Sequence, residues 1–181
     1  MDYRQTATYF HAYGRVAEAS SHRERQLVQP LSEDEWTEII SKKKKAAVGI
    51  ISNCHAHSNR GFYIEKLNQS IPLTLFGKCY GNPSCVWNVV SALFIAAPKC
   101  EMELFDQHYF YLSFENGQCT DYVTEKFWKL KYNMVPIVLE RRLLKGIAPD
   151  SMFIAADDFK SPADLANHLR YLMDHPNEYR K

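Results

Sequence analysis

The hydrophobic positions of this chain form short runs separated by polar segments, in an order that alternates strands with helices. Residues 46–51 are an apolar run typical of a buried strand, and a helix with Phe62, Tyr63 and Leu67 roughly in phase follows a polar turn over residues 52–59. Further strands are predicted at residues 73–77, 110–114, 135–139 and 152–155, with a helical segment after Tyr122. This alternation predicts an α/β fold, a Rossmann-like parallel sheet flanked by helices.

A final helix is predicted from residue 161 onward. Ser161 is a suitable N-cap and Pro162 suits the first helical position, while the His175-Pro176 pair should stop the helix. One face is apolar and should pack on the core, through Leu165, Leu169, Leu172 and Met173.

Charge and hydropathy exclude two classes of partner. The 181 residues include 22 Lys and Arg against 21 Asp and Glu, so no global basic field exists to hold a nucleic acid. The longest apolar stretch, residues 86–98, is too short to span a membrane. The lysines at 42–45 read as the solvated lead-in to the first strand rather than as a targeting patch.

Five cysteines suit an oxidising compartment: Cys54, Cys79, Cys85, Cys100 and Cys119. A structural disulfide is expected, but the sequence does not determine which cysteines pair. The odd number of cysteines leaves one of them unpaired. Cys54-His55-Ala56-His57 contains possible zinc ligands, but no C-x-x-C pair completes a site, so no metal is predicted. Asn68-Gln69-Ser70 is a sequon that predicts glycosylation at Asn68.

The candidate chemistry lies in residues 110–128, which read as strand, loop and helix. Ligands of α/β sheets bind beyond the carboxyl ends of strands, and a helix N-terminus with Lys126 nearby favours a phosphate. Each residue also has a structural interpretation: Asp121 as a helix cap, Glu125 and Lys126 as a solvated turn, Glu115-Asn116 as loop-shaping residues. Neither a Walker pattern nor G-x-G-x-x-G is present.

The strings F-Y-L-S-F-E-N at 110–116 and D-Y-V-T-E-K-F-W at 121–128 resemble the signature of the α1,3-fucosyltransferase family, whose members use GDP-fucose and invert the fucose carbon. The resemblance extends upstream to Ser52-Asn53-Cys54, Arg60 and Tyr63, and downstream to V-P-I-V at 135–138 and S-M-F-I-A-A-D-D-F-K-S-P at 151–162. The cysteine spacing and the last string are most similar to the invertebrate and plant branch that fucosylates the N-glycan core.

This resemblance implies the C-terminal, donor-binding half of a two-domain glycosyltransferase-B fold. Residues 1–41 would be an interdomain lead-in segment and residues 42–181 the GDP-fucose-binding Rossmann-like domain, with the acceptor domain outside this chain. The full-length relatives are type II membrane glycoproteins of the Golgi lumen, so membrane attachment would come only from an N-terminal anchor elsewhere.

The resemblance also assigns residues. Arg60 and Lys126 would contact the diphosphate, Asn116 and Tyr122 would line the donor site, and Glu125 would accept a hydroxyl of ribose or fucose. The general base is expected in the acceptor domain, so no catalytic residue is assigned in this chain, although Glu115 or Asp157 could be proposed. No cofactor is expected; the partners would be GDP-fucose and, through the other domain, a glycan acceptor.

Four positions depart from the family pattern: His108-Tyr109 replaces Tyr-Lys, Gly117 replaces serine, and Glu140 replaces glycine. If Glu140 faced the nucleotide, its carboxylate would repel the phosphates and mark a degraded donor site. Two alternatives therefore stand beside the transferase: a GDP-sugar-binding pseudoenzyme, and a Rossmann-like interaction module that binds no nucleotide.

Overall fold

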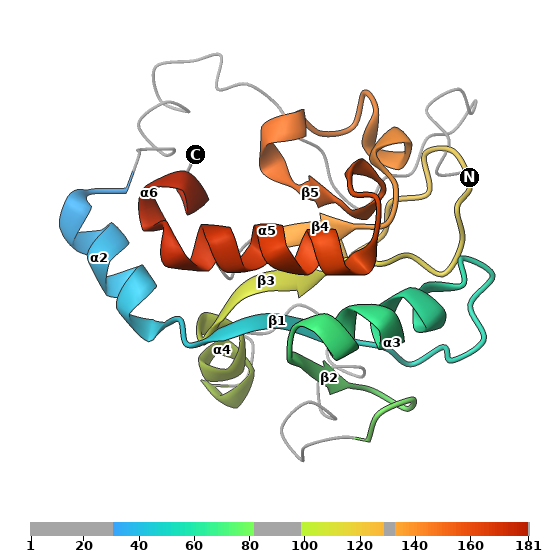
Figure 1. Cartoon of the computed structure of the whole chain (residues 1–181), viewed down its shortest axis with the longest axis horizontal. Helices are drawn as coiled ribbons and strands as arrows, with labels where there is room; N and C mark the ends of the chain where they lie inside the picture. The colour runs from blue at the N-terminus through green and yellow to red at the C-terminus, as the bar shows by residue number, and fades with distance from the viewer. Residues whose placement is uncertain (1–30, 82–98, 129–132, 181) are drawn as a thin grey trace.

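The computed structural model describes residues 31–81, 99–128 and 133–180, which form a five-stranded parallel sheet between helices (Figure 1). The strands are β1 (Lys45–Ile50), β2 (Leu73–Phe76), β3 (His108–Leu112), β4 (Val135–Val138) and β5 (Ile154–Ala155). Their order is β2-β1-β3-β4-β5, and each neighbouring pair is parallel. The predicted parallel α/β fold is confirmed.

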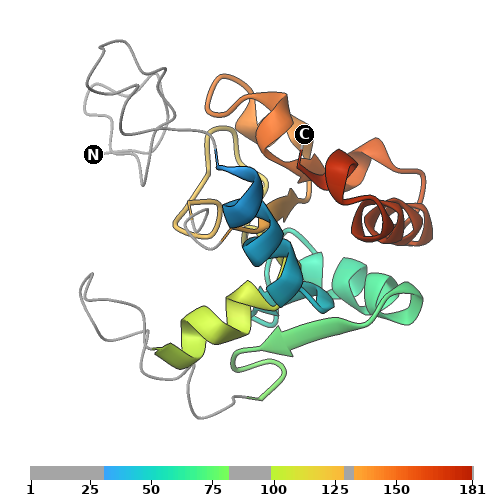
Figure 2. The same cartoon turned by 90° about the vertical axis from the view of Figure 1, so that its left-hand side faces the viewer.

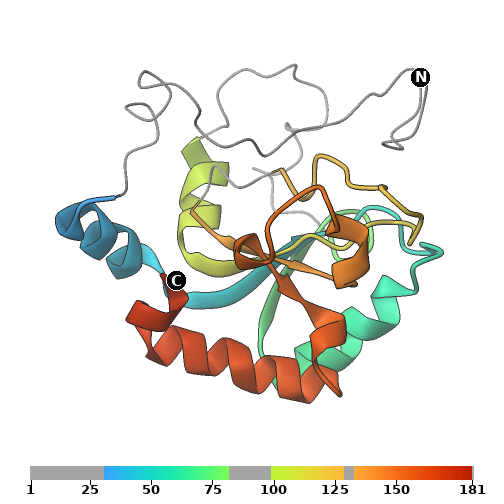
Figure 3. The ribbon, with the colours of Figure 1, turned by 90° about the horizontal axis from the view of Figure 1, so that it is seen from above.

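Helices cover both faces of the sheet. Helices α3 (Arg60–Ser70) and α5 (Pro162–Asp174) pack on each other along one face, and α4 (Lys99–Asp106) lies on the other (Figure 3). Helix α2 (Glu33–Lys42) lies near the short α6 (Pro176–Tyr179), where Arg180 and Glu33 form an ion pair of 2.5 Å (Figure 2). Beyond their carboxyl ends, β1 leads into the loop before α3, and β3 leads into the loop that begins at Ser113.

The side chains of β3 divide the core in two, because successive residues of a strand point to opposite faces. Phe110 and Leu112 pack with Ile64 of α3 and Leu165 of α5, all nearly solvent-free. Tyr111 points the other way and meets Phe105 of α4 edge to face, with 6.0 Å between ring centroids. Burial on both faces explains why β3 is apolar without alternation.

The ends of α5 agree with the sequence analysis. The Ser161 side chain accepts a hydrogen bond from the Asp164 N–H at 3.2 Å, and the helix ends at Asp174, before His175-Pro176. Helix α2 was not predicted, although Ser32 and Glu35 form a complete capping box at its start. Strand β3 begins two residues earlier than predicted, at His108, a buried residue whose ring bonds Leu104 and Thr74.

The helix predicted after Tyr122 is wrong within the described residues up to 128. Residues 125–128 form a turn, and Asp121 adopts a left-handed φ of 62° instead of capping a helix. The Thr124 N–H is bound by the side chain of Glu115, and Phe127 is drawn into a core cluster with Val138 and Phe153. These long-range contacts override the helical pattern of the local sequence.

The lysine run also differs from expectation. Lys43 is only 6% exposed, and its ammonium group donates a hydrogen bond of 2.8 Å to the His108 carbonyl. Burial lowers the pKa of Lys43 to about 8. Lys43 is thus part of the packed structure, while its neighbours Lys42, Lys44 and Lys45 are exposed.

Among the described residues, no helix has the length and apolar character of a membrane span. The apolar stretch at residues 86–98 lies outside them.

Candidate functional site

The predicted site residues gather at one edge of the sheet, where the loops after β1 and β3 meet. The main-chain N–H of Ser58 donates to the Asn116 carbonyl at 3.1 Å, and its hydroxyl donates to the Glu115 carbonyl at 2.7 Å. These two bonds join the loop before α3 to the loop after β3. Such an edge, beyond the carboxyl ends of parallel strands, is where α/β proteins bind their ligands.

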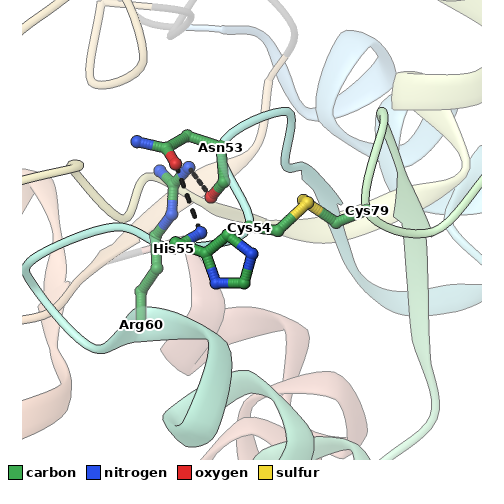
Figure 4. Close-up of a disulfide and its surroundings, with 5 residues drawn as sticks. All are labelled: Asn53, Cys54, His55, Arg60 and Cys79. Atoms are coloured by element: carbon green, nitrogen blue, oxygen red, sulfur yellow. Dashed lines mark hydrogen bonds between the residues drawn. A yellow bond between two sulfur atoms is a disulfide. The ribbon is translucent and has the colours of Figure 1, made fainter.

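Arg60 is the first residue of α3 and points across this edge (Figure 4). It is only 2% exposed, and its guanidinium donates to the carbonyl oxygens of Phe114 at 2.5 Å and Asn53 at 3.2 Å. Burial lowers the pKa of Arg60, and the nearby Glu115 carboxylate partly offsets this. An arginine guanidinium is not deprotonated in proteins, so Arg60 is a fixed cation at the edge of the sheet.

Three buried polar atoms at this edge lack a hydrogen-bond partner in the described part of the chain: Arg60 Nε, Ser113 Oγ and Asn116 Oδ1. Buried polar groups in folded proteins are normally hydrogen-bonded. A cluster of such groups beside a fixed cation is consistent with a polar ligand or with ordered water.

Lys126 is held by a small network around Glu115. The Glu115 carboxylate accepts from the Thr124 N–H at 2.7 Å and from the Thr124 hydroxyl at 2.9 Å. The Lys126 ammonium group donates to Thr124 Oγ1 at 3.0 Å and to Glu125 at 3.2 Å, and lies 3.4 Å from Glu115 Oε2. The lysine is therefore placed by its neighbours, without a helix N-terminus to support it.

Glu125 is the exposed member of this network. Burial acts to raise the pKa of its carboxyl, but the Lys126 charge and hydrogen bonds outweigh that effect and hold the pKa below its ordinary value. Glu125 is thus a carboxylate at neutral pH, and its oxygens can accept hydroxyl hydrogen bonds.

A pocket lies beside this network, between the loop after β3 and the segment after β4. Its polar walls are Ser113, Glu115 and Tyr122, and its apolar walls are Val123, Phe127, Val138, Leu139, Leu143 and Leu144. Tyr122 and Arg60 are close enough that the phenol influences the pKa of the guanidinium. All five predicted donor-site residues, Arg60, Asn116, Tyr122, Glu125 and Lys126, thus belong to the two joined loops or the first residue of α3.

Glu140 does not carry a free negative charge toward this site. Its carboxylate forms an ion pair of 2.5 Å with Arg142 and accepts a short hydrogen bond from Gln118. Its φ of −138° is accessible to any residue, so this backbone does not require the glycine usual in the family.

The segment after β4 is fixed by a charge cluster that sequence reasoning missed. Arg141 forms ion pairs with Asp150 at 2.7 Å and Asp158 at 2.5 Å, and its guanidinium lies 4.9 Å from the centre of the Phe153 ring. These partners raise the pKa of Arg141. Asp157 also binds this segment, because its carboxylate accepts a hydrogen bond of 2.9 Å from the Arg141 N–H.

The disulfide joins Cys54 to Cys79 and ties the loop before α3 to the segment after β2 (Figure 4). Cys54 therefore has no thiolate to offer a metal ion, which removes it from the possible zinc ligands. Cys119 is a free, exposed cysteine. Cys85 and the side chain of Cys100 lie outside the described residues.

Asn68 lies in the last turn of α3, where its side chain is exposed and its Oδ1 accepts a hydrogen bond from the Leu73 N–H at 2.9 Å. The sequon is therefore on the surface.

The fold and the site together place the chain in the class of α/β domains that bind ligands beyond the carboxyl ends of parallel strands, with two cations at that edge. The chain belongs to glycosyltransferase family 10, the fucosyltransferases, since the model of that family's C-terminal part matches residues 40–181. It is 35% identical over 143 residues to alpha-(1,3)-fucosyltransferase fut-1 of Caenorhabditis elegans, covering 78% of this chain and 31% of that protein. It is 38% identical over 144 residues to glycoprotein 3-alpha-L-fucosyltransferase A of Drosophila melanogaster, and the match covers 77% of this chain and 26% of that protein.

Comparison with solved structures supports the same family. The chain superposes with a TM-score of 0.57 and 27% identity on a crystal structure of an alpha1,3-fucosyltransferase with GDP-fucose, covering 76% of this chain and 38% of that one. The family resemblance read from the sequence is confirmed. The chain spans less than half the length of these curated relatives.

Proposed function

We propose that this chain is the donor-binding part of an α1,3-fucosyltransferase and binds GDP-fucose at the edge formed by Arg60, Asn116, Tyr122, Glu125 and Lys126. The observation that carries the proposal is that the loop after β3 binds both cations in a chain of family 10: Arg60 through the Phe114 carbonyl and Lys126 through the Glu115 carboxylate. An alpha1,3-fucosyltransferase of the same fold has been solved with GDP-fucose.

The chemistry of these residues suits a nucleoside diphosphate sugar. When the fucose–phosphate bond breaks, negative charge grows on the diphosphate, and fixed cations stabilise that charge more in the transition state than in the ground state. Arginine can bind phosphate oxygens in pairs, and lysine contributes a point charge. The Glu125 carboxylate would accept a hydrogen bond from a hydroxyl group of the ribose or the fucose.

The whole protein would transfer fucose in α1,3 linkage, with inversion, to a GlcNAc of an N-glycan or related glycoconjugate. The acceptor platform and the general base would lie outside these 181 residues, which span 31% of the worm relative fut-1. We expect no cofactor or metal in this scheme, in which Arg60 and Lys126 contact the diphosphate directly. We also propose that the full-length protein is a type II membrane protein whose catalytic part lies in the Golgi lumen.

Calorimetry with GDP and GDP-fucose tests the donor site. The wild-type chain should bind both, and Lys126→Ala should weaken both by about 1 to 3 kcal/mol, the usual contribution of a charged hydrogen bond. Lys66→Ala is the matched control, because Lys66 is an exposed lysine on α3 that contacts the Phe62 ring. Failure of the wild type to bind GDP would instead favour an interaction module without nucleotide.

A further inference from the structure

Glu115 is a buried carboxylate that none of the donor-contact assignments uses. It is 6% exposed and forms an ion pair of 3.4 Å with Lys126, and its charge acts to raise the pKa of Arg60. A buried charge is costly unless it is paired and hydrogen-bonded. The structure meets that condition through Thr124 and Lys126.

The hydrogen bonds around Glu115 have a direction. The Lys126 ammonium group donates to the Thr124 hydroxyl at 3.0 Å, and that hydroxyl, which has a single proton, donates to the Glu115 carboxylate at 2.9 Å. Lysine has only donors and an ionised carboxylate only acceptors, so this chain cannot run the other way. The Thr124 hydroxyl therefore bridges the two side chains, and the Lys126 ammonium group is held in place relative to Glu115.

Glu115 is itself firmly placed. It follows β3 by three residues, its carbonyl accepts from the Ser58 hydroxyl at 2.7 Å, and its carboxylate also binds the Thr124 N–H at 2.7 Å. Lys126, in contrast, lies on a turn outside any helix, closed by a hydrogen bond of 3.2 Å from the Phe127 N–H to the Thr124 carbonyl. A lysine side chain has four rotatable bonds and loses much rotamer freedom when it is fixed.

We propose that Glu115 is the positioning residue of the donor site: its buried charge holds the Lys126 ammonium group, partly through Thr124, where it can meet a diphosphate. This inference rests on the proposed donor site. Without the Glu115 charge, Lys126 would regain rotamer freedom that it must lose again when a phosphate binds. Because Glu115 is buried behind Thr124 and Lys126, its own charge is already compensated before any ligand arrives.

The test is a double-mutant cycle with GDP as ligand and calorimetry as measurement. Glu115→Gln keeps the side-chain shape and an acceptor for the Thr124 N–H but removes the charge. It should weaken GDP binding about tenfold when Lys126 is present, and by less than about twofold in the Lys126→Ala background. Glu65→Gln, an exposed change of the same kind on α3, is the matched control and should leave binding unchanged.

Two results would overturn the inference. Equal weakening in both backgrounds would mean that Glu115 supports the loop independently of Lys126, and tighter GDP binding would mean that Glu115 competes with the phosphates. Should Glu115→Gln fail to fold, Thr124→Val removes the intermediate hydroxyl and should also weaken GDP binding only when Lys126 is present.

A measurement without ligand separates this inference from the proposed function. NMR relaxation of the Lys126 side-chain Cε–H groups should show a restricted ammonium end in the wild type and a mobile one in Glu115→Gln. If GDP did not bind but this difference appeared, the donor function would fail and the positioning role would stand. Equal mobility in both proteins would overturn the positioning role.

Discussion

The Arg60 guanidinium, at the first residue of α3, donates a hydrogen bond of 2.5 Å to the Phe114 carbonyl, two residues beyond the end of β3. This bond crosses 54 residues of sequence and couples the loop before α3 to the loop that carries the signature motif. The residue proposed to bind phosphate is therefore also part of the structure of its own site.

Replacing Arg60 should consequently reduce both stability and ligand binding. Arg60→Ala leaves buried carbonyl groups without a donor and should lower the free energy of unfolding by about 3 kcal/mol, measured by urea denaturation, besides abolishing detectable GDP binding. Arg170→Ala is the control, because that arginine also donates to a main-chain carbonyl, of Ser70, but is exposed on α5. An Arg60→Ala variant that binds GDP normally would remove Arg60 from the donor site.

Loss of the disulfide should destabilise the domain. Cys54 and Cys79 are 25 residues apart, and closing a loop of that size restricts the unfolded chain by about 3 to 4 kcal/mol in the chain-entropy treatment. The Cys54→Ser/Cys79→Ser double variant should therefore show a lower urea midpoint. Cys119→Ser should not, because Cys119 is free and exposed.

Gly77 should tolerate no side chain. Its φ is +104°, and an added Cβ would lie 2.3 Å from the Ile51 carbonyl oxygen. Gly81 has a similar positive φ of +80° but open space around it, so Gly81→Ala should cost only the backbone strain of about 1 to 2 kcal/mol. Gly77→Ala should cost clearly more in thermal or urea unfolding, and equal costs would contradict this packing.

Stability should fall as the pH decreases from about 6.5 to about 4 because of His108. Burial, then the charges of Lys45 and Lys43, lower the pKa of His108 to about 4 against a Leu104 hydrogen bond that acts to raise it. The unfolded histidine takes up a proton near pH 6.5, and the folded one only near pH 4, so acid favours the unfolded state. His108→Asn should flatten the pH dependence of the urea midpoint in this window.

Surface exposure of Asn68 allows a direct test of the compartment. Expressed in a secretory pathway, the protein should carry an N-glycan at Asn68, detected as a mobility shift that a glycosidase removes. Asn68→Gln should abolish the shift, and an unglycosylated wild type would count against a lumenal location for this segment.

The isolated 181-residue chain should transfer no fucose to an N-glycan acceptor. In the proposed scheme the acceptor platform and the general base lie outside these 181 residues. Testing the chain alone would then remove rate factors of roughly 10⁵ or more for positioning and 10² to 10⁴ for proton transfer. An assay of the purified chain with GDP-fucose checks this. Any product that depends on Glu115 would mean that the base lies within the chain.

The order of elements could be predicted from local sequence, because buried strands form short apolar runs and a helix buried on one side repeats its apolar residues at a fixed period. The strands at 45–50, 73–76 and 135–138 and the Ser161 cap of α5 follow from such patterns. The signature motif likewise identified the family, since Arg60, Asn116 and Lys126 could be matched position by position.

Contacts between distant segments were decided only by the tertiary structure. Nothing near Thr124 indicates that Glu115, nine residues earlier, takes its N–H and leaves a turn where a helix was expected. Lys43 is likewise buried with a partner, because its ammonium group donates a hydrogen bond to the His108 carbonyl, 65 residues away. Cys54 pairs with Cys79 because the fold brings their two loops together. Local periodicity reports which face of an element is buried, whereas these pairings depend on which elements lie side by side.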